Sequence, residues 1–238
     1  MEKRIGNILI RYIRVKRALT KSALGFYTLN HYIGCTHACD YCYAGLYAKK
    51  FYGLDTWGDV VLVKENALHL LRKEVKKGMN IWLSSMSDPY QPIEAVEQLT
   101  RKIIGILGRK GANIDILTKN PLVLRDLDLL IRYRATVGFT IISTRPNPLE
   151  RRAPHPRRRI YALRKLKEAG IRTYVFVGPI LPETDVERII ELTKDYADLY
   201  YFDRLRHARE LDLVPYYPDR SEIRRIAKEH GINARILF

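Results

Sequence analysis

Residues 34–44 read GCTHACDYCYA and place Cys35, Cys39 and Cys42 in a C-x3-C-x2-C pattern. The chain has 238 residues and no other cysteine. An odd number of cysteines within eight residues is a poor disulfide framework and favours a metal or cofactor site. Three thiolates can hold three irons of a cubane and leave the fourth iron open, whereas four cysteines normally hold an iron–sulfur cluster.

Two other interpretations of this loop are possible. A structural zinc site needs four ligands, but the chain has no second cysteine pair. His37 lies inside the loop and is better explained as a neighbouring residue than as a ligand. Three unliganded thiols at this spacing would be unusual. The pattern therefore favours an iron–sulfur cluster with one open coordination position.

Strand-like and helix-like segments alternate outward from the loop. Six buried strands are predicted, at residues 26–33, 80–84, 114–118, 135–141, 172–178 and 199–202. Apolar stripes predict amphipathic helices at Val96, Leu99, Ile103 and Leu107, and at Ile160, Leu163 and Leu166. Gly111 and Gly170 stand where helices should end, and Ser221 should begin a last short helix.

This alternation predicts an α/β fold with parallel strands and right-handed crossovers. About six such units fit, fewer than the eight of a complete barrel, so we expect an open, partial (β/α)6 barrel. Its chemistry should lie on loops after the C-terminal ends of strands. We expect residues 1–238 to form one domain, with 1–25 as a basic N-terminal extension and 206–238 as a C-terminal extension packed on the barrel.

The net charge of +16 is concentrated in two segments. Residues 1–21 carry seven Lys or Arg and one Glu, and residues 144–172 carry ten and two. Such clustering predicts a polyanionic partner, here a nucleic acid, although the surface of a heat-adapted protein is an alternative. The second segment follows the strand that ends near Thr140, so its start should lie at the mouth of the site. Residues 1–21 would extend that positive surface if they folded against the same rim.

No stretch approaches the roughly 18 consecutive apolar residues that a membrane span needs. The N-terminal residues also lack the apolar core and cleavage site of a signal peptide. The sequence therefore predicts a cytoplasmic protein with no membrane partner.

The cysteine loop, with an aromatic residue before its last cysteine, resembles that of the radical S-adenosylmethionine (SAM) superfamily. Further motifs are similar to the spore photoproduct lyase-like family, also called DNA repair photolyase-like, and cover roughly residues 26–205. They are LNHYIGC at 29–35, SDPYQPIE at 87–94, LTR at 99–101, TK at 118–119, RDLDLL at 125–130 and GPI at 178–180. The resemblance implies a radical-SAM barrel in which Cys35, Cys39 and Cys42 hold a 4Fe–4S cluster. It also implies an external electron donor and reductive cleavage of SAM to a 5′-deoxyadenosyl radical that abstracts hydrogen.

The resemblance also implies which residues bind SAM. The turn that contains Ser85, Ser87 and Asp88 should approach the methionine portion. Lys119 resembles a contact to the SAM carboxylate, although lysines are usually exposed on the surface. Thr140 matches a hydroxyl residue near the ribose, and Arg159 matches a basic residue able to meet a carboxylate with two hydrogen bonds.

Catalytic candidates are Tyr41 and Tyr43, which flank the last cysteine where the lyase has tyrosines near the cofactor. These rings could equally pack against the cluster. The lyase also uses a fourth cysteine as a hydrogen donor, and here the corresponding strand end, residues 84–88, reads SSMSD. A serine hydroxyl is a far poorer hydrogen-atom donor than a thiol, so a tyrosine would have to replace it.

Three functions are compatible with these features. The first is a lyase-like radical-SAM enzyme acting on a nucleic acid, supported by the cysteine loop and the basic segments. The second is a radical-SAM enzyme acting on a protein or a small molecule. The third is a non-catalytic iron–sulfur protein that binds nucleic acid, which the open iron position and the Thr118-Lys119 strand end argue against.

Overall fold

The structure is a computed structural model and describes residues 2–22 and 25–238. Its main sheet has eight strands in the order β12-β11-β10-β9-β8-β7-β4-β3. They are β3 (Leu19–Lys21), β4 (Tyr27–Leu29), β7 (Asn80–Leu83), β8 (Asn113–Thr118), β9 (Thr136–Thr140), β10 (Arg172–Ile180), β11 (Leu199–Arg204) and β12 (Ala234–Ile236). All neighbours run parallel except β3, which is antiparallel to β4. The predicted α/β fold with a parallel, partial barrel is confirmed, and β3 and β12 are the edges of this sheet.

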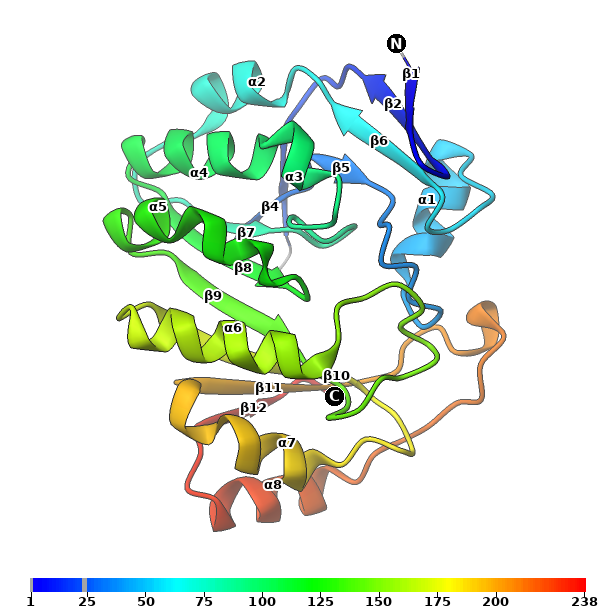
Figure 1. Cartoon of the computed structure of the whole chain (residues 1–238), viewed down its shortest axis with the longest axis vertical. Coiled ribbons are helices and arrows are strands. Elements are labelled where there is room, and N and C mark those ends of the chain that lie inside the picture. Colours follow the sequence, from blue (N-terminus) through cyan, green and yellow to red (C-terminus); the bar gives the residue numbers. More distant parts are fainter. Residues whose placement is uncertain (1, 23–24) are drawn as a thin grey trace.

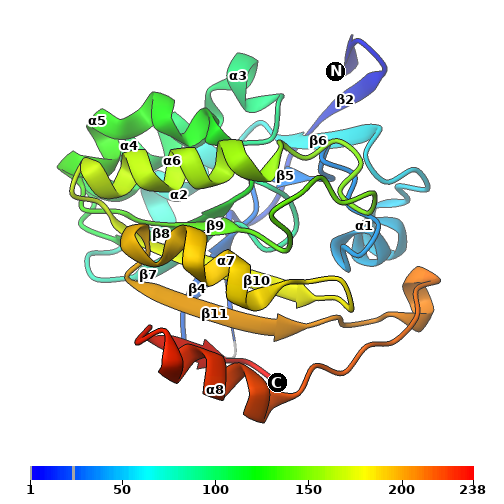
Figure 2. The same cartoon turned by 60° about the horizontal axis from the view of Figure 1, so that its bottom comes forward.

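Helices cover one face of this sheet, as Figure 2 shows for α4 and α6. The helices are α1 (Ala44–Tyr52), α2 (Ala67–Glu74), α3 (Glu94–Glu97), α4 (Leu99–Arg109), α5 (Leu127–Arg132), α6 (Pro156–Glu168), α7 (Val186–Thr193) and α8 (Arg220–Glu229). Alternate strand residues such as Ile116, Val137 and Val175 are fully buried in the core together with Leu163 and Leu166 of α6. The core therefore lies between the sheet and the helices, and the opposite face of the strands is left to line cavities. Among the described residues, no helix is long and apolar enough to cross a membrane.

The N-terminal segment forms regular structure. The strands β1 (Glu2–Ile5) and β2 (Ile8–Ile13) make an antiparallel hairpin, and β2 pairs with β6 (Val60–Lys64) in a second sheet of order β1-β2-β6-β5. Figure 1 places this hairpin at the opposite end of the molecule from α8. The C-terminal segment likewise contributes α8 and β12, which extends the main sheet beyond β11.

The predicted strand at 26–33 is wrong in one respect, because the chain forms two short strands in different sheets: β4 pairs with β7, and β5 (Tyr32–Ile33) pairs with β6. Asn30 and His31 separate them. The Asn30 amide oxygen accepts hydrogen bonds from the backbone N–H groups of Ser85 and Met86, and the His31 ring contacts Thr100. The His31 carbonyl still accepts the N–H of Lys64 in β6, so the change from one sheet to the other occurs at Asn30 and His31.

The predicted helical stripe that begins at Val96 is also broken. Gln98 has a φ of +49°, so α3 ends there and α4 begins at Leu99, which leaves Val96 59% exposed. The Glu94 carboxylate accepts hydrogen bonds from the N–H groups of Leu99 and Thr100 and thereby caps α4.

The expected helix ends are found at Gly111 and Gly170, which have φ values of +70° and +76° after α4 and α6. Helix α8 begins slightly earlier than predicted. Its N-cap is Asp219, whose carboxylate accepts the N–H of Ser221.

Candidate active site

A cavity of about 210 Å³ opens at the C-terminal ends of the parallel strands, and the cysteine loop forms one side of it. Figure 1 shows α1, which follows this loop, on the side toward which the arrows of β8 and β9 point. The predicted site residues that line the cavity are Cys35, Cys39, Cys42, Tyr41, Tyr43, Ser85, Ser87, Asp88, Lys119 and Thr140. The topology therefore brings together residues that are as much as 105 positions apart, from Cys35 to Thr140.

The entry into the cysteine loop requires a glycine. Gly34 has a φ of +87°, and a Cβ atom there would lie 2.3 Å from the carbonyl oxygen of Val60. The loop is then held from outside: the Arg151 guanidinium pairs with Asp40 at 2.8 Å and donates to the carbonyl of Ala38. The backbone N–H of Arg152 also donates to the carbonyl of His37. Two residues of the basic segment 144–172 therefore contact the cysteine loop.

The three thiols fit a cluster better than a single metal ion. Burial raises the pKa of Cys39 to about 12 and also raises those of Cys35 and Cys42, so the thiols stay protonated until a metal displaces the protons. Among the described residues, no three His, Cys, Asp or Glu side chains are arranged to hold one metal ion. A cubane spreads its ligands over three irons, so this donor set suits it better than it suits zinc.

Asp88 lines the cavity, but its carboxylate is already occupied by protein donors. One oxygen accepts from the Thr118 hydroxyl at 2.6 Å and the Tyr90 N–H at 2.8 Å, and the other accepts from the Lys119 N–H at 2.7 Å. Nε2 of His37 lies 3.2 Å from that second oxygen. Burial alone would raise the pKa of Asp88, but these partners outweigh it and lower the pKa. Asp88 therefore links His37 of the cysteine loop to Thr118 and Lys119 at the end of β8.

Lys119 is directed into the site, and the alternative of an exposed surface lysine is wrong because its side chain is only 13% exposed. Its ammonium lies 3.7 Å from a carboxylate oxygen of Glu150 and 5.6 Å from the centre of the Tyr41 ring. Glu150 also accepts the Tyr41 hydroxyl at 2.5 Å. Burial opposes ionisation of Glu150, but the charges of Lys119 and Arg159 prevail and lower its pKa.

Arg159 was expected to contact the cofactor, and the structure places it elsewhere. It is 1% exposed and is not among the residues that line the cavity. Its guanidinium does meet a carboxylate with two hydrogen bonds, but that carboxylate belongs to Glu150. It also donates to the carbonyl of Thr140 at 3.1 Å. No pattern in the sequence pointed to Glu150, which lies inside a segment dominated by basic residues.

The two candidate tyrosines differ in what their hydroxyl groups do. The Tyr41 hydroxyl is buried and bound to Glu150, whereas Tyr43 is 38% exposed and donates to the backbone carbonyl of Ser85 at 2.9 Å. Ser87 donates to the carbonyl of Tyr32 at 3.1 Å, so the serine turn is fixed from behind. Tyr43 therefore lies at the open side of the cavity and Tyr41 at the closed side.

Besides the predicted Lys119, two arginines at the cavity come from an element outside the predicted basic segments. No residue of 1–21 or 144–172 lines it among the residues described, whereas Arg204 and Arg206, at and just after the end of β11, do. Arg206 pairs with Asp203 at 3.0 Å, and Arg204 has no carboxylate partner in the described part of the chain. The rule that sites follow strand ends, applied to the predicted strand 199–202, would have found them.

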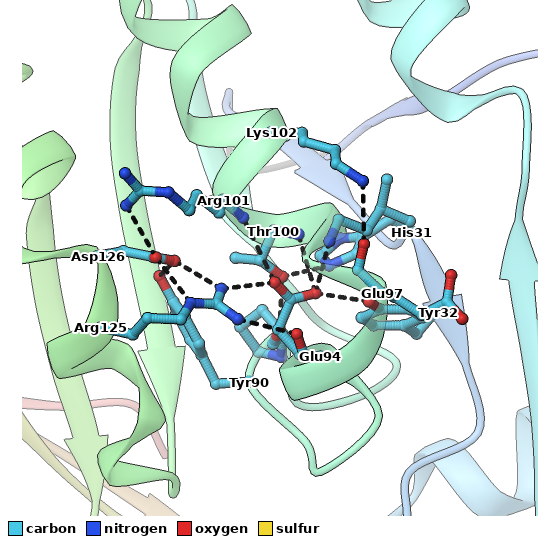
Figure 3. A network of polar contacts seen from close by, with 12 residues as sticks. His31, Tyr32, Tyr90, Glu94, Glu97, Thr100, Arg101, Lys102, Arg125 and Asp126 are labelled. Atoms are coloured by element: carbon cyan, nitrogen blue, oxygen red, sulfur yellow. Dashed lines mark hydrogen bonds and ion pairs between the residues drawn. The ribbon is translucent and has the colours of Figure 1, made fainter. Parts of the chain in front are cut away.

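Several motifs that carried the family resemblance form a buried polar network behind the site (Figure 3). Arg125 donates to both Glu94 and Asp126, and the Tyr90 hydroxyl donates to Asp126 at 3.0 Å. The Tyr32 hydroxyl donates to Glu94 at 2.5 Å. These residues do not line the cavity. They hold the segment 87–94 in place, and with it Asp88, beneath the cysteine loop.

Comparison with known proteins places this geometry in a family. The model of the radical SAM superfamily matches residues 29–195. An uncharacterised protein of Methanocaldococcus jannaschii is 41% identical over 229 residues, which is 92% of this chain and 87% of that protein. An uncharacterised protein of Acidianus two-tailed virus is 32% identical over 210 residues, covering 79% of this chain and 69% of that protein.

Solved structures show the same fold. A spore photoproduct lyase complexed with dinucleoside spore photoproduct has a TM-score of 0.66 at 17% identity, covering 96% of this chain and 82% of that one. Streptococcus suis SuiB bound to SAM has a TM-score of 0.51 at 11% identity, covering 67% of this chain and 39% of that one. The parallel partial barrel, the cavity at its strand ends and the match over residues 29–195 together establish that the chain belongs to the radical SAM superfamily, a family of enzymes that use a 4Fe–4S cluster and SAM.

Proposed function

We propose that Cys35, Cys39 and Cys42 hold the cluster, and that the adjoining cavity binds SAM. The observation that carries this assignment is that the three thiols share one cavity with Lys119 and Thr140. Once bound, the two cofactors supply a 5′-deoxyadenosyl radical for hydrogen abstraction. The chain positions the cofactor. The Lys119 ammonium binds the carboxylate of SAM, and the buried walls of the cavity exclude water.

We further propose that the substrate is a nucleic acid, so that the enzyme is lyase-like. The support is the +16 charge, Arg204 at the cavity, which has no ion pair among the described residues, and the fold shared with a lyase complexed with a dinucleoside photoproduct. The base that reacts must leave its stack to reach the cavity, at a cost of a few kcal/mol. Single-stranded or damaged nucleic acid should therefore react better than an intact duplex.

Tyr43 is the better candidate for a hydrogen donor in place of the missing cysteine. Its ring is at the open side of the cavity, and its hydroxyl donates only to a backbone carbonyl. The Tyr41 hydroxyl is engaged with Glu150, whose negative charge adds to burial in raising the tyrosine pKa. Tyr41 is thus better suited to position Lys119 than to exchange hydrogen.

The test is deuterium transfer. The protein, reconstituted anaerobically and reduced, is incubated with SAM and a deuterated oligonucleotide, single-stranded, ultraviolet-irradiated or duplex. Deuterium in the 5′-deoxyadenosine released is the expected result, with Cys39→Ala as the inactive control. Cleavage of SAM without any transfer would reject nucleic acid and leave a protein or small molecule as substrate. No cleavage under any condition would favour a non-catalytic protein.

A further inference from the structure

Helix α1 carries a row of exposed aromatic rings that begins at the cavity. Tyr43, Tyr47 and Phe51 are spaced four residues apart, which places them on one helical face. They are 38%, 39% and 62% exposed, and each ring centre is 5.9 Å from the next. The His207 ring lies 6.4 Å from Tyr47 and 6.5 Å from Tyr43. Because Tyr43 lines the cavity, the row runs from its mouth out into solvent.

This row is not part of the protein core. The small residues Ala44 and Ala48 form the buried face of α1, and the aromatic side chains stand away from it. Large rings that remain in water lose the free energy that burial would provide, so adjacent exposed rings mark a binding surface.

The charges around the row favour an anionic ligand. The Lys50 ammonium lies 5.5 Å from the centre of the Phe51 ring, and Lys49 is exposed beside it. In the described residues, neither lysine has an ion pair, and Arg204 at the cavity has none either. Of the two acidic groups beside His207, Asp203 is paired with Arg206 at 3.0 Å, and the Glu210 carboxylate lies 3.4 Å from Nδ1 of His207.

We propose that this surface, defined as Tyr43, Tyr47, Phe51 and His207, is a stacking platform for the unpaired bases of a single-stranded nucleic acid. The inference rests on the proposed nucleic-acid substrate and adds its single-stranded form and the path by which it enters. Base–aromatic stacking combined with backbone-tracking cations is the usual way in which single strands bind without sequence preference. A duplex offers no free base faces for such stacking. The strand therefore lies along α1, and a base at the Tyr43 end enters the cavity.

The experiment measures binding of a fluorescein-labelled 20-residue oligothymidylate to the reconstituted protein by anisotropy at several salt concentrations. The double variant Tyr47→Ala/Phe51→Ala should bind at least about tenfold more weakly than the wild type, because two stacking rings are lost. Tyr161→Ala is the matched control, since Tyr161 is 57% exposed on α6 and also has a lysine over its ring. Tyr47→Phe, which keeps the ring, should bind like the wild type. Circular dichroism of each variant checks that the fold is intact.

A second readout reports stacking directly. In Phe51→Trp, the oligonucleotide should quench the fluorescence of the added indole. The loss of fluorescence should exceed that of the wild type, which has only the two native tryptophans. Salt-sensitive binding by the wild type that is equally strong in the double variant would overturn the platform while leaving the nucleic-acid substrate intact. Absence of salt-sensitive binding by the wild type would instead overturn the proposed substrate and the platform with it.

Discussion

Replacing Glu150 by Gln tests whether a buried charge network supports the site. Glu150 and Arg159 are 7% and 1% exposed, and the pair is joined by two hydrogen bonds. Removing one partner leaves the Arg159 charge uncompensated in the interior. Such a loss costs about 3–5 kcal/mol, a large part of a typical folding free energy of roughly 5–15 kcal/mol.

The assay is urea unfolding of the reduced, metal-free protein followed by circular dichroism. With a slope of up to about 3 kcal/mol per molar urea, the midpoint should fall by roughly 1 M or more. The matched control is Glu168→Gln at the end of α6, the helix that carries Arg159; the ion pairs of Glu168 with Arg164 and Lys165 are exposed to water and should matter little. Equal midpoints for the two variants would refute the claim that Glu150 is a buried anion.

The pH dependence of the difference in unfolding free energy between the wild type and Glu150→Gln gives an independent check. The pKa of Glu150 in the folded protein lies below its usual value of 4.5. The stabilisation is therefore complete above pH 4.5 and is lost as pH falls through the lower, folded-state pKa. The gap between wild type and Glu150→Gln should narrow only in that acid range. A gap that stays constant down to strong acid would show that the carboxylate acts by packing and not by charge.

Three further outcomes are expected. Anaerobic reconstitution should give about four irons per chain, and Cys39→Ala should abolish the cluster, as iron analysis and visible absorption would show; tightly bound zinc with no cluster would contradict this. Lys119→Met should leave the iron content unchanged but weaken SAM binding at least about tenfold by equilibrium dialysis, because a charge-assisted contact to the SAM carboxylate is lost. Arg204→Glu should reduce the salt dependence of oligonucleotide binding by about one phosphate contact or more, whereas Arg11→Glu, at a residue that does not line the cavity, should change it less.

The sequence was informative where chemistry is local in the chain. The C-x3-C-x2-C spacing lies within eight residues, so its chemistry could be inferred without knowing the fold. The strand ends that carry Ser87, Lys119 and Thr140 were also predictable, because parallel strands bring their C-terminal ends to one edge. Period-two and period-3.6 patterns also predicted the strands β7 to β11 and the positions of α4, from Leu99 onward, and α6.

Tertiary structure decided every feature that depends on partners distant in the chain. Glu150 gave no local signal, and only the fold brings it to Tyr41, which is 109 residues away. The resemblance gave Arg159 a contact to the cofactor, but in the fold the carboxylate it meets is Glu150. The split of residues 26–33 also follows from distant groups, since Asn30 binds the backbone of Ser85 and Met86.

The basic segments show the same division. Composition determined that the protein carries a large positive charge, because charge is a sum over residues and needs no fold. The fold decides what each charged residue contacts. Arg151 pairs with Asp40 of the cysteine loop, Lys3 pairs with Glu97, and Arg204 lines the cavity. A sequence specifies which charged groups a chain contains. Burial, ion pairing and distance to a cavity arise only when the chain folds, and these decide which charges remain free to bind a ligand.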